Sequence, residues 1–505
     1  MKHWTLLNTS AATALCLTGS AAFADVTAQD VWGSWKEQME QFGYSVSADE
    51  SMSGGTLTLS NIVMNVVIPE DEGKVTLELG TMSFAENGDG TVDMIIPAAL
   101  PMKAKVDVEN DDDVEFILNL TSAGMKNTIS GTPDNMTFTY KADSLGVEMT
   151  NLTVEGEAID LGAAKLEMTG VSGLSNTVEG AVKTAKQSFA AQSLNYLLDM
   201  ADPDGKEGRV FLKGALSGLS SDGASSMPEG VDMQDMNAAL KAGFGFNGGF
   251  THTGGQTEFT FTSPEDQFSG STSTTGGAFG IAMDAGQLVY ELASQGLAVD
   301  MSGSDIPLPV SFRMQQAAMK LMMPLAKSDA LQDYQISLTL GDFTMADLLW
   351  GIFDPTQQLP RDPATIDVDL TGQVKLTHDL MDEKAMAQLG GTPPGELHAT
   401  NINTLTVRAA GAELTGNGGF TFDNTDLTSF DGMPRPEGTL NLQLIGGNGL
   451  LDKLVAMGFV PEDQAMGARM MMGLFAVPGA GEDTLTSTIE VNEQGHVLAN
   501  GQRLK

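Results

Sequence analysis

Short stretches of alternating apolar and polar residues decide the fold, and residues 74–79, with the sequence KVTLEL, are typical of them. The same alternation occurs at residues 56–59 (TLTL), 103–108 (KAKVDV) and 113–120 (DVEFILNL). A period of two turns successive side chains to opposite faces of a strand, one against an apolar core and one in water. Turn compositions such as NGDG at residues 87–90 separate these stretches. This part of the sequence therefore predicts a long antiparallel meander.

The apolar period changes to that of a helix in several places. We expect helices near residues 28–42, 175–200, 231–242, 313–327, 345–353 and 449–475. In residues 175–200, for example, Val178, Val182, Phe189 and Leu197 form an apolar stripe. Strand alternation resumes between the expected helices and continues to the end of the chain.

The length of 505 residues exceeds what one ordinary hydrophobic core organises. We therefore expect two β-rich regions, an N-terminal one at residues 25–310 and a C-terminal one at 311–505. They follow a predicted signal peptide at residues 1–24. The predicted fold class is mainly β with helical inserts (α+β). Its centre is a long curved antiparallel sheet, and amphipathic helices pack on the sheet or cap it, because so long a sheet must curl and cover its apolar face.

The charge excludes one class of partner. The chain has 26 Lys and Arg residues against 66 Asp and Glu residues, and its formal net charge is −40. A polyanion of this kind does not bind a nucleic-acid backbone, since no counterion release drives the association. Electrostatic docking on anionic lipid is disfavoured for the same reason.

The first 24 residues have the pattern of a secretory signal peptide. A basic start at Lys2 precedes an uncharged segment, and Ala22 and Ala24 form an Ala-x-Ala cleavage site. The single cysteine, Cys16, lies inside this segment, but Leu15 before it is not the small residue that a lipidation site needs. We therefore predict export to the periplasm, cleavage after Ala24 and a mature chain without cysteine. No later stretch has the length of an apolar transmembrane helix.

Several stretches in the second half carry a family resemblance. They are Asp342-Phe343, Trp350, Asp354-Pro355, LPRDPAT at residues 359–365, PEGTL at 436–440, GNGLL at 447–451 and GHVLANG at 495–501. Together they resemble the signature of a family of uncharacterised periplasmic proteins from alphaproteobacteria that carry a domain of unknown function. The resemblance implies a location and an architecture but no chemistry. More loosely, the run of amphipathic strands is similar to AsmA-type envelope proteins, whose curved sheets carry lipid in a groove.

The motifs give no support for catalysis. Four histidines follow the signal segment, His252, His378, His398 and His496, and none stands at the spacing of a zinc motif. The NGDG stretch would place Ala85 at the first ligand position of a calcium loop, so we interpret it as a hairpin turn. The acidic residues 109–113 are interpreted as a solvated loop rather than a cation site. We assign no catalytic, cofactor-binding or metal-ligating residue and expect no cofactor.

Methionine is unusually frequent, with 30 residues. Two clusters stand out, Met314, Met319, Met322 and Met323, and Met466, Met470, Met471 and Met472. Thioethers bind Cu(I), but no His or Cys accompanies either cluster. Flexible core packing or an adaptable apolar binding surface explains them more simply.

Three functional hypotheses follow. In the first, a non-catalytic periplasmic envelope protein binds a lipid, another hydrophobic ligand or a partner protein on the concave face of its sheet. The groove would be lined by Leu57, Leu59, Leu77, Leu79, Phe116 and Leu118. In the second, a pair of converging carboxylates with raised pKa hydrolyses envelope material. The third is a purely structural or scaffolding role.

Overall fold

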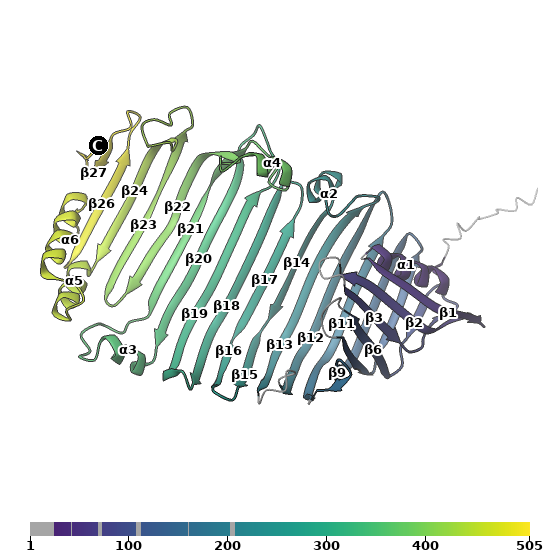
Figure 1. Cartoon of the computed structure of the whole chain (residues 1–505). Coiled ribbons are helices and arrows are strands. Elements are labelled where there is room, and N and C mark those ends of the chain that lie inside the picture. Colours follow the sequence, from purple (N-terminus) through teal and green to yellow (C-terminus); the bar gives the residue numbers. More distant parts are fainter. Residues whose placement is uncertain (1–24, 42, 69–72, 108–112, 160, 202–207) are drawn as a thin grey trace, which may run out of the picture.

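The computed structural model describes residues 25–41, 43–68, 73–107, 113–159, 161–201 and 208–505. In these residues, 28 strands join one sheet in which all the pairings are antiparallel. Figure 1 shows the strands side by side, following the chain from one end of the sheet to the other. The predicted signal peptide and most of the acidic stretch 109–113 lie outside the described residues.

The strands fall into three consecutive groups. The first contains β1 (Tyr44–Ser53), β2 (Thr56–Ile68), β3 (Gly73–Leu79), β4 (Met82–Glu86), β5 (Val92–Ile95), β6 (Ala99–Asp107), β7 (Val114–Ala123), β8 (Lys126–Thr132), β9 (Asn135–Val154) and β10 (Glu157–Ala158). The second contains β11 (Leu161–Val178), β12 (Val182–Ala201), β13 (Arg209–Pro228), β14 (Gly245–His252), β15 (Gly254–Thr262), β16 (Gln267–Thr274), β17 (Gly276–Met283), β18 (Gln287–Gly303), β19 (Ile306–Pro324) and β20 (Gln332–Met345). The third contains β21 (Ala364–Leu376), β22 (Gly395–Ala409), β23 (Ala412–Asp423), β24 (Arg435–Ile445), β25 (Val477–Pro478), β26 (Thr484–Val491), β27 (Val497–Ala499) and β28 (Gln502–Arg503).

The helices lie at the ends and rims of the sheet. They are α1 (Ala28–Gln41), α2 (Met236–Ala242), α3 (Asp347–Phe353), α4 (Glu383–Gln388), α5 (Gly447–Ala456) and α6 (Glu462–Phe475). In Figure 1, α1 lies at the N-terminal end of the sheet, the α5–α6 pair lies at the opposite end, and α2, α3 and α4 follow the two rims. The helices expected near residues 28–42 and 449–475 are present as α1 and as α5 with α6.

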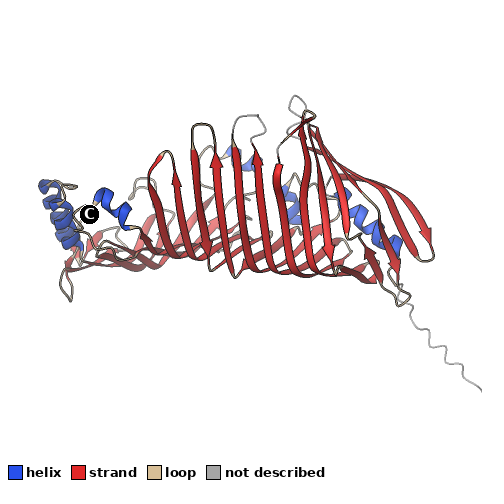
Figure 2. Ribbon diagram, turned by 90° about the horizontal axis from the view of Figure 1, so that it is seen from below, coloured by secondary structure: helices blue, strands red, loops and turns tan. Residues whose placement is uncertain are grey.

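The sheet bends along one line that crosses many of its strands. Gly124, Gly170, Gly218 and Gly296 have φ angles between +56° and +61°, in the left-handed region that glycine adopts without strain. The strand registers place Gly170 and Gly218 opposite the same residue, Gln192. Because these residues recur on every second or third strand of the ladder, the bends coincide and curve the sheet into the trough seen in Figure 2.

The bend is closely packed. A Cβ at Gly218 would lie 2.4 Å from the Oγ1 atom of Thr253, and one at Gly296 would lie 2.5 Å from Oγ1 of Thr275. Thr253 itself donates from its backbone N–H and its hydroxyl group to the carbonyl of Ser217. Each of these glycines therefore provides both a backbone conformation and the space for a side chain on the neighbouring strand.

One end of the trough is filled by a conventional hydrophobic core. Val31 and Trp32 of α1 are buried against Leu57, Leu59 and Phe84 of the sheet. The indole Nε1 of Trp32 also donates a hydrogen bond to Glu50, at 2.8 Å. Helix α1 therefore closes the N-terminal end of the trough.

Two predicted helices are wrong. Residues 175–200 form the end of β11 and most of β12, and residues 313–327 lie mainly in β19. Both segments are rich in Ala, Gln, Leu, Met and Lys, which favour helices in isolation. In each, pairing with strands on both sides outweighs that local preference.

The helices expected near residues 231–242 and 345–353 are present as α2 and α3 but are shorter than expected. The boundary expected between residues 310 and 311 falls within β19.

The packing at the bend predicts a specific loss of stability. We expect Gly218→Ala to lower the free energy of unfolding by about 2–4 kcal/mol, because the left-handed strain adds to the clash with Thr253. Gly230→Ala is the matched control, since Gly230 has φ +68° but a Cβ added there would meet no atom within 4 Å, and strain alone costs about 1–2 kcal/mol. Urea unfolding followed by circular dichroism measures both values, and equal losses would contradict the packing argument.

Candidate functional site

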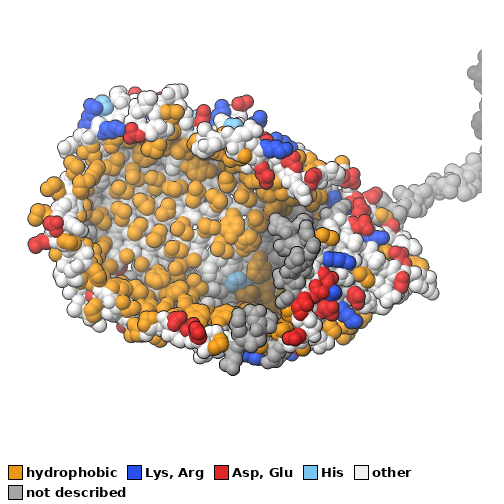
Figure 3. Space-filling view, in the orientation of Figure 1, with side chains coloured by type: hydrophobic (Ala, Val, Ile, Leu, Met, Phe, Trp, Pro, Cys, Tyr) orange, Lys and Arg blue, Asp and Glu red, His pale blue; other side chains and the backbone are white. Residues whose placement is uncertain are grey.

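The concave wall of the trough is apolar from strand to strand. One row of paired residues crosses six strands, and its members are Phe279, Leu292, Met319, Leu338, Val368 and Leu405. Paired residues share one face of a sheet. Several of these side chains are exposed, including Leu292 at 46% and Met319 at 40%. Figure 3 shows the same property over the whole hollow face, where hydrophobic side chains dominate.

The next row of paired residues is on the opposite face and is polar. Its members are Gly280, Glu291, Lys320, Ser337, Asp369 and Thr404. Lys320 and Glu291 form an ion pair of 2.6 Å across β18 and β19. The alternation predicted from the N-terminal strands therefore also separates the two faces of the central strands.

The concave wall is also free of charge over a long distance. In the described strands from β14 to β24, each Asp, Glu, Lys and Arg lies at an outward position, with the exception of Asp342 at the bend. Asp342 bonds to the outward Arg408 at 2.6 Å. A polar ligand group brought to this wall would find no ionic partner there.

Aromatic rings lie across glycines of the neighbouring strands and fill the space that side chains would occupy there. A Cβ at Gly214 would lie 2.3 Å from Cζ of Tyr196, and one at Gly173 would lie 2.2 Å from Cζ of Tyr140. The hydroxyl group of Tyr196 bonds to Thr257 at 2.5 Å. In the same way, Tyr334 covers Gly372 and bonds to Thr400 at 2.6 Å. These hydroxyl groups are satisfied by the protein itself, so the wall offers few free polar groups to a ligand.

The residues predicted to line the groove lie on the concave side, but at its closed end. Leu57 and Leu59 are buried beneath α1, and Leu77 and Leu79 pack against the same core. Phe116 and Leu118 are half-buried on the continuation of that face. The open part of the wall belongs instead to later strands. The sequence signal that could have identified it is the apolar residue at every second position of β18, as at Leu288, Tyr290 and Leu292.

The far end of the wall forms an apolar pocket of about 430 Å³ beneath α6. Met471, Met472 and Phe475 of the helix face Leu442 and Leu444 of the sheet there. The pairings of Val407 with Leu414, and of Leu414 with Leu444, make this pocket continuous with the concave wall. The Met466–Met472 cluster is therefore placed at one end of the trough.

The described residues contain no arrangement that suggests hydrolysis or metal binding. No group of three or more His, Cys, Asp or Glu residues is placed to hold a metal ion in this part of the chain. Where the surroundings change the pKa of a described carboxyl group, they lower it, and the groups are Asp89, Asp107, Asp300, Asp379, Asp423, Asp426 and Asp483. A general acid needs the opposite change.

A clasp holds the segment that follows α3. Arg361 bonds to Asp347 at the start of α3, and its guanidinium group lies 5.9 Å from the ring centre of Trp350. Asp354, which is fully buried, accepts hydrogen bonds from the backbone N–H groups of Gln358 and Leu359. The residues that carry the family resemblance thus include a structural clasp at the rim.

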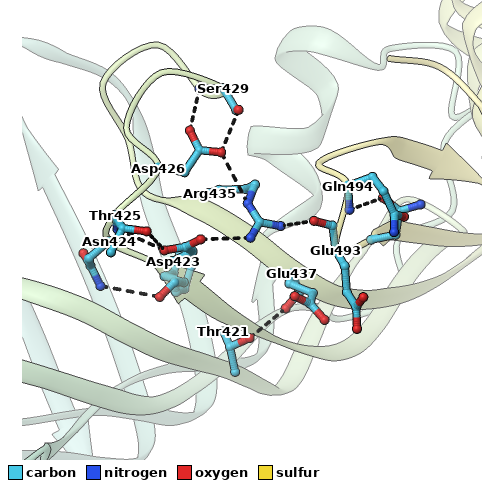
Figure 4. A network of polar contacts seen from close by, with 12 residues as sticks. Thr421, Asp423, Asn424, Thr425, Asp426, Ser429, Arg435, Glu437, Glu493 and Gln494 are labelled. Carbon is cyan, nitrogen blue, oxygen red and sulfur yellow. Dashed lines mark hydrogen bonds and ion pairs between the residues drawn. The ribbon is translucent and has the colours of Figure 1, made fainter.

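A polar network fastens the loop between β23 and β24 (Figure 4). Arg435 bonds to Asp423 at 2.9 Å and to the backbone carbonyl of Glu493 at 2.5 Å. Hydrogen bonds from the Thr425 hydroxyl, the Arg435 guanidinium and the Thr425 backbone N–H lower the pKa of Asp423 to about 2. The network joins the loop to the segment that follows β26.

This pKa predicts how stability depends on pH. A carboxyl group with a lowered folded-state pKa stabilises the fold above its unfolded pKa of 3.8 and loses that contribution as the pH falls through about 2. We therefore expect Asp423→Asn to be less stable than the wild type at neutral pH, and the difference to shrink between about pH 4 and pH 2. Urea unfolding across this range measures it. The control is Asp329→Asn, because the exposed Asp329 reaches only Lys375, at 3.9 Å, and a pH-dependent difference of the same size in the control would refute the assignment.

Comparisons with known proteins identify a family but no activity. No described helix is both long enough and apolar enough to cross a membrane. No curated protein and no solved structure matches the chain. Residues 244–501, about half of the chain, match a family described as an uncharacterized protein conserved in bacteria, in agreement with the expected membership of an uncharacterised family. The chain therefore belongs to the DUF2125 family.

Proposed function

We propose that this protein is a non-catalytic envelope protein that holds the acyl chains of lipid against the concave wall of its trough. The observation that carries the proposal is the uncharged row of paired apolar residues from Phe279 to Leu405, much of it exposed. Soluble proteins rarely leave an apolar surface of this extent uncovered unless it binds something.

The dimensions suit an acyl chain. Six paired strands span five interstrand gaps, or ~24 Å at the usual strand spacing. One leaflet of a bilayer has a hydrocarbon thickness of ~15 Å. Covering ~400 Å² of apolar wall would contribute about 10 kcal/mol before the entropic cost of binding. A single row of the wall is therefore long enough for the chains of a phospholipid.

The chemistry of the wall favours a hydrocarbon over a polar ligand. Tyr196 and Tyr334, which reach into the trough, use their hydroxyl groups on Thr257 and Thr400. Charges occupy the outward positions of β14 to β24. A ligand rich in hydrogen-bonding groups would lose its hydration without gaining partners, whereas a hydrocarbon has no such cost.

The envelope location in this proposal depends on the sequence of residues 1–24. Export would bring the protein to the compartment where lipids move between membranes. The loose likeness to AsmA-type proteins supports the same role. Because the described carboxyl groups give no converging acid and base, we favour carriage over hydrolysis.

A charge on the wall should abolish ligand binding. We expect Leu338→Glu to weaken binding of a fluorescent fatty acid at least about tenfold, because a carboxylate would be buried against hydrocarbon without a partner. Ser337→Glu is the matched control, since Ser337 is the adjacent residue of β20 and lies on the outward face beside Lys320. Its binding should stay close to that of the wild type.

Native mass spectrometry of the wild type, purified without detergent, should show retained lipid, and Leu338→Glu should show less. Circular dichroism of both variants checks that the sheet is intact. If the wild type retains no lipid and binds no fatty acid, or if the two variants bind equally well, the proposed function is wrong.

A further inference from the structure

The two helical caps of the trough are packed very differently. Val31 of α1 is fully buried and Trp32 is only 4% exposed, so this cap is part of a closed core. In α6, every residue is exposed except Ala465 and Met472. The α5–α6 pair is joined to the sheet mainly at its ends. The carboxylate of Asp483 accepts from the backbone N–H groups of Asn448 and Gly449, and the carbonyl of Phe475 accepts from Ser487.

The surface of α6 that faces away from the sheet is apolar. Met466, Met470 and Leu474 are 64%, 73% and 44% exposed. They are four residues apart and so form one stripe along the helix. Phe459, in the turn between α5 and α6, is 54% exposed. A helix that presents its large apolar residues to solvent has an unpartnered face.

This outer stripe is joined to the trough by an apolar surface. Met471 lies beside the stripe, is 54% exposed, and also lines the pocket beneath the helix. Phe475 is likewise both exposed and part of the pocket lining. From this pocket the wall continues through Leu444 and Leu414 to Val407. An acyl chain could pass from the outer surface of α6 to the wall without crossing a charged side chain.

We propose that the stripe Met466, Met470 and Leu474 docks on the surface of a zwitterionic lipid bilayer, and that lipid enters the trough at this end. The inference rests on the proposed function. A continuous apolar path from the outside to the binding wall serves a lipid layer, which is itself the source of the ligand. The flexible methionine side chains suit the irregular packing of lipid at an interface.

The charges near the stripe determine the kind of lipid surface. Arg469, the one basic residue of α6, is paired with Asp452, and Glu462 and Asp463 begin the helix. The chain as a whole carries a net charge of −40. No basic cluster accompanies the stripe on the helix, so docking relies on apolar burial, and an anionic surface repels the protein. Binding should therefore be stronger to zwitterionic than to anionic vesicles.

Flotation of the full chain with vesicles tests the proposal. The wild type should float with phosphatidylcholine vesicles and should float less when half of the lipid is phosphatidylglycerol. The double variant Met466→Glu/Met470→Glu should lose vesicle binding at least about tenfold, because two carboxylates replace side chains that enter the lipid. Met433→Glu is the matched control, since Met433 is 65% exposed but lies in the loop before β24, and it should float like the wild type.

A second measurement separates this inference from the proposed function. The double variant should still bind a fluorescent fatty acid added from solution, since its wall is unchanged, but should extract labelled phosphatidylcholine from vesicles at least about tenfold more slowly. If the wild type does not bind the fatty acid, the proposed function of the trough is wrong. Flotation measures vesicle docking independently of fatty-acid binding, so the two proposals can fail separately. The docking proposal is overturned if the wild type does not float, or if the double variant and Met433→Glu behave alike. It is also overturned if sedimentation shows a wild-type dimer that the double variant dissociates, because the stripe would then join two copies of this chain.

Discussion

The trough depends on one backbone constraint, a line of residues in the left-handed conformation that crosses the sheet and recurs every second or third strand. Gly124, Gly170, Gly218, Gly296 and Asp342 all have φ between +53° and +61°, and the register sets Gln192 between Gly170 and Gly218. Since β-strands otherwise keep φ negative, these positions bend the strands together rather than one by one. Neighbouring strands keep the same register on both sides of the bend, so they stay paired along both arms of the trough.

A single sheet of amphipathic strands has an apolar face that needs cover, and this chain covers it unevenly. At the N-terminal end, α1 supplies the second layer of an ordinary core around Leu57, Leu59 and Phe84. Beyond it, the described residues provide only short rim helices and the α5–α6 pair. Stability over the uncovered strands therefore depends on backbone pairing, on rings such as Tyr196 lying over Gly214, and on outward ion pairs such as Lys320 with Glu291. The exposed wall is tolerated because these contacts hold each strand to its neighbours.

The alternation of apolar and polar residues was sufficient to predict the antiparallel sheet and its apolar face, and the length of the sheet indicated that it curves. It was insufficient in β12 and β19, where helix-favouring residues such as Ala185, Gln187, Met319 and Lys320 fill strands whose pairing partners lie elsewhere in the chain. Pairing is a long-range property that local propensity does not record.

The groove residues were placed on the correct face, but Leu57 and Leu59 were expected to be open. Whether a helix covers a given strand depends on the position of α1 in space, and the sequence carries no local signal for it. The bend was missed as well, since glycines in turns and glycines at the bend look alike in sequence.

The family match covers one part of the described sheet and leaves out the other. Residues 244–501 contain the strands from β14 to β27 and the α5–α6 pair, whereas α1 and its core lie before the match. The matched part thus holds most of the uncovered wall, the pocket beneath α6 and the exposed methionine stripe, and it lacks the closed end. In the matched part, an apolar surface extends over many strands, and every charge of β14 to β24 except that of Asp342 lies on the other side. The chain as a whole carries a net charge of −40, and the proposed lipid site uses the face of these strands from which that charge is absent.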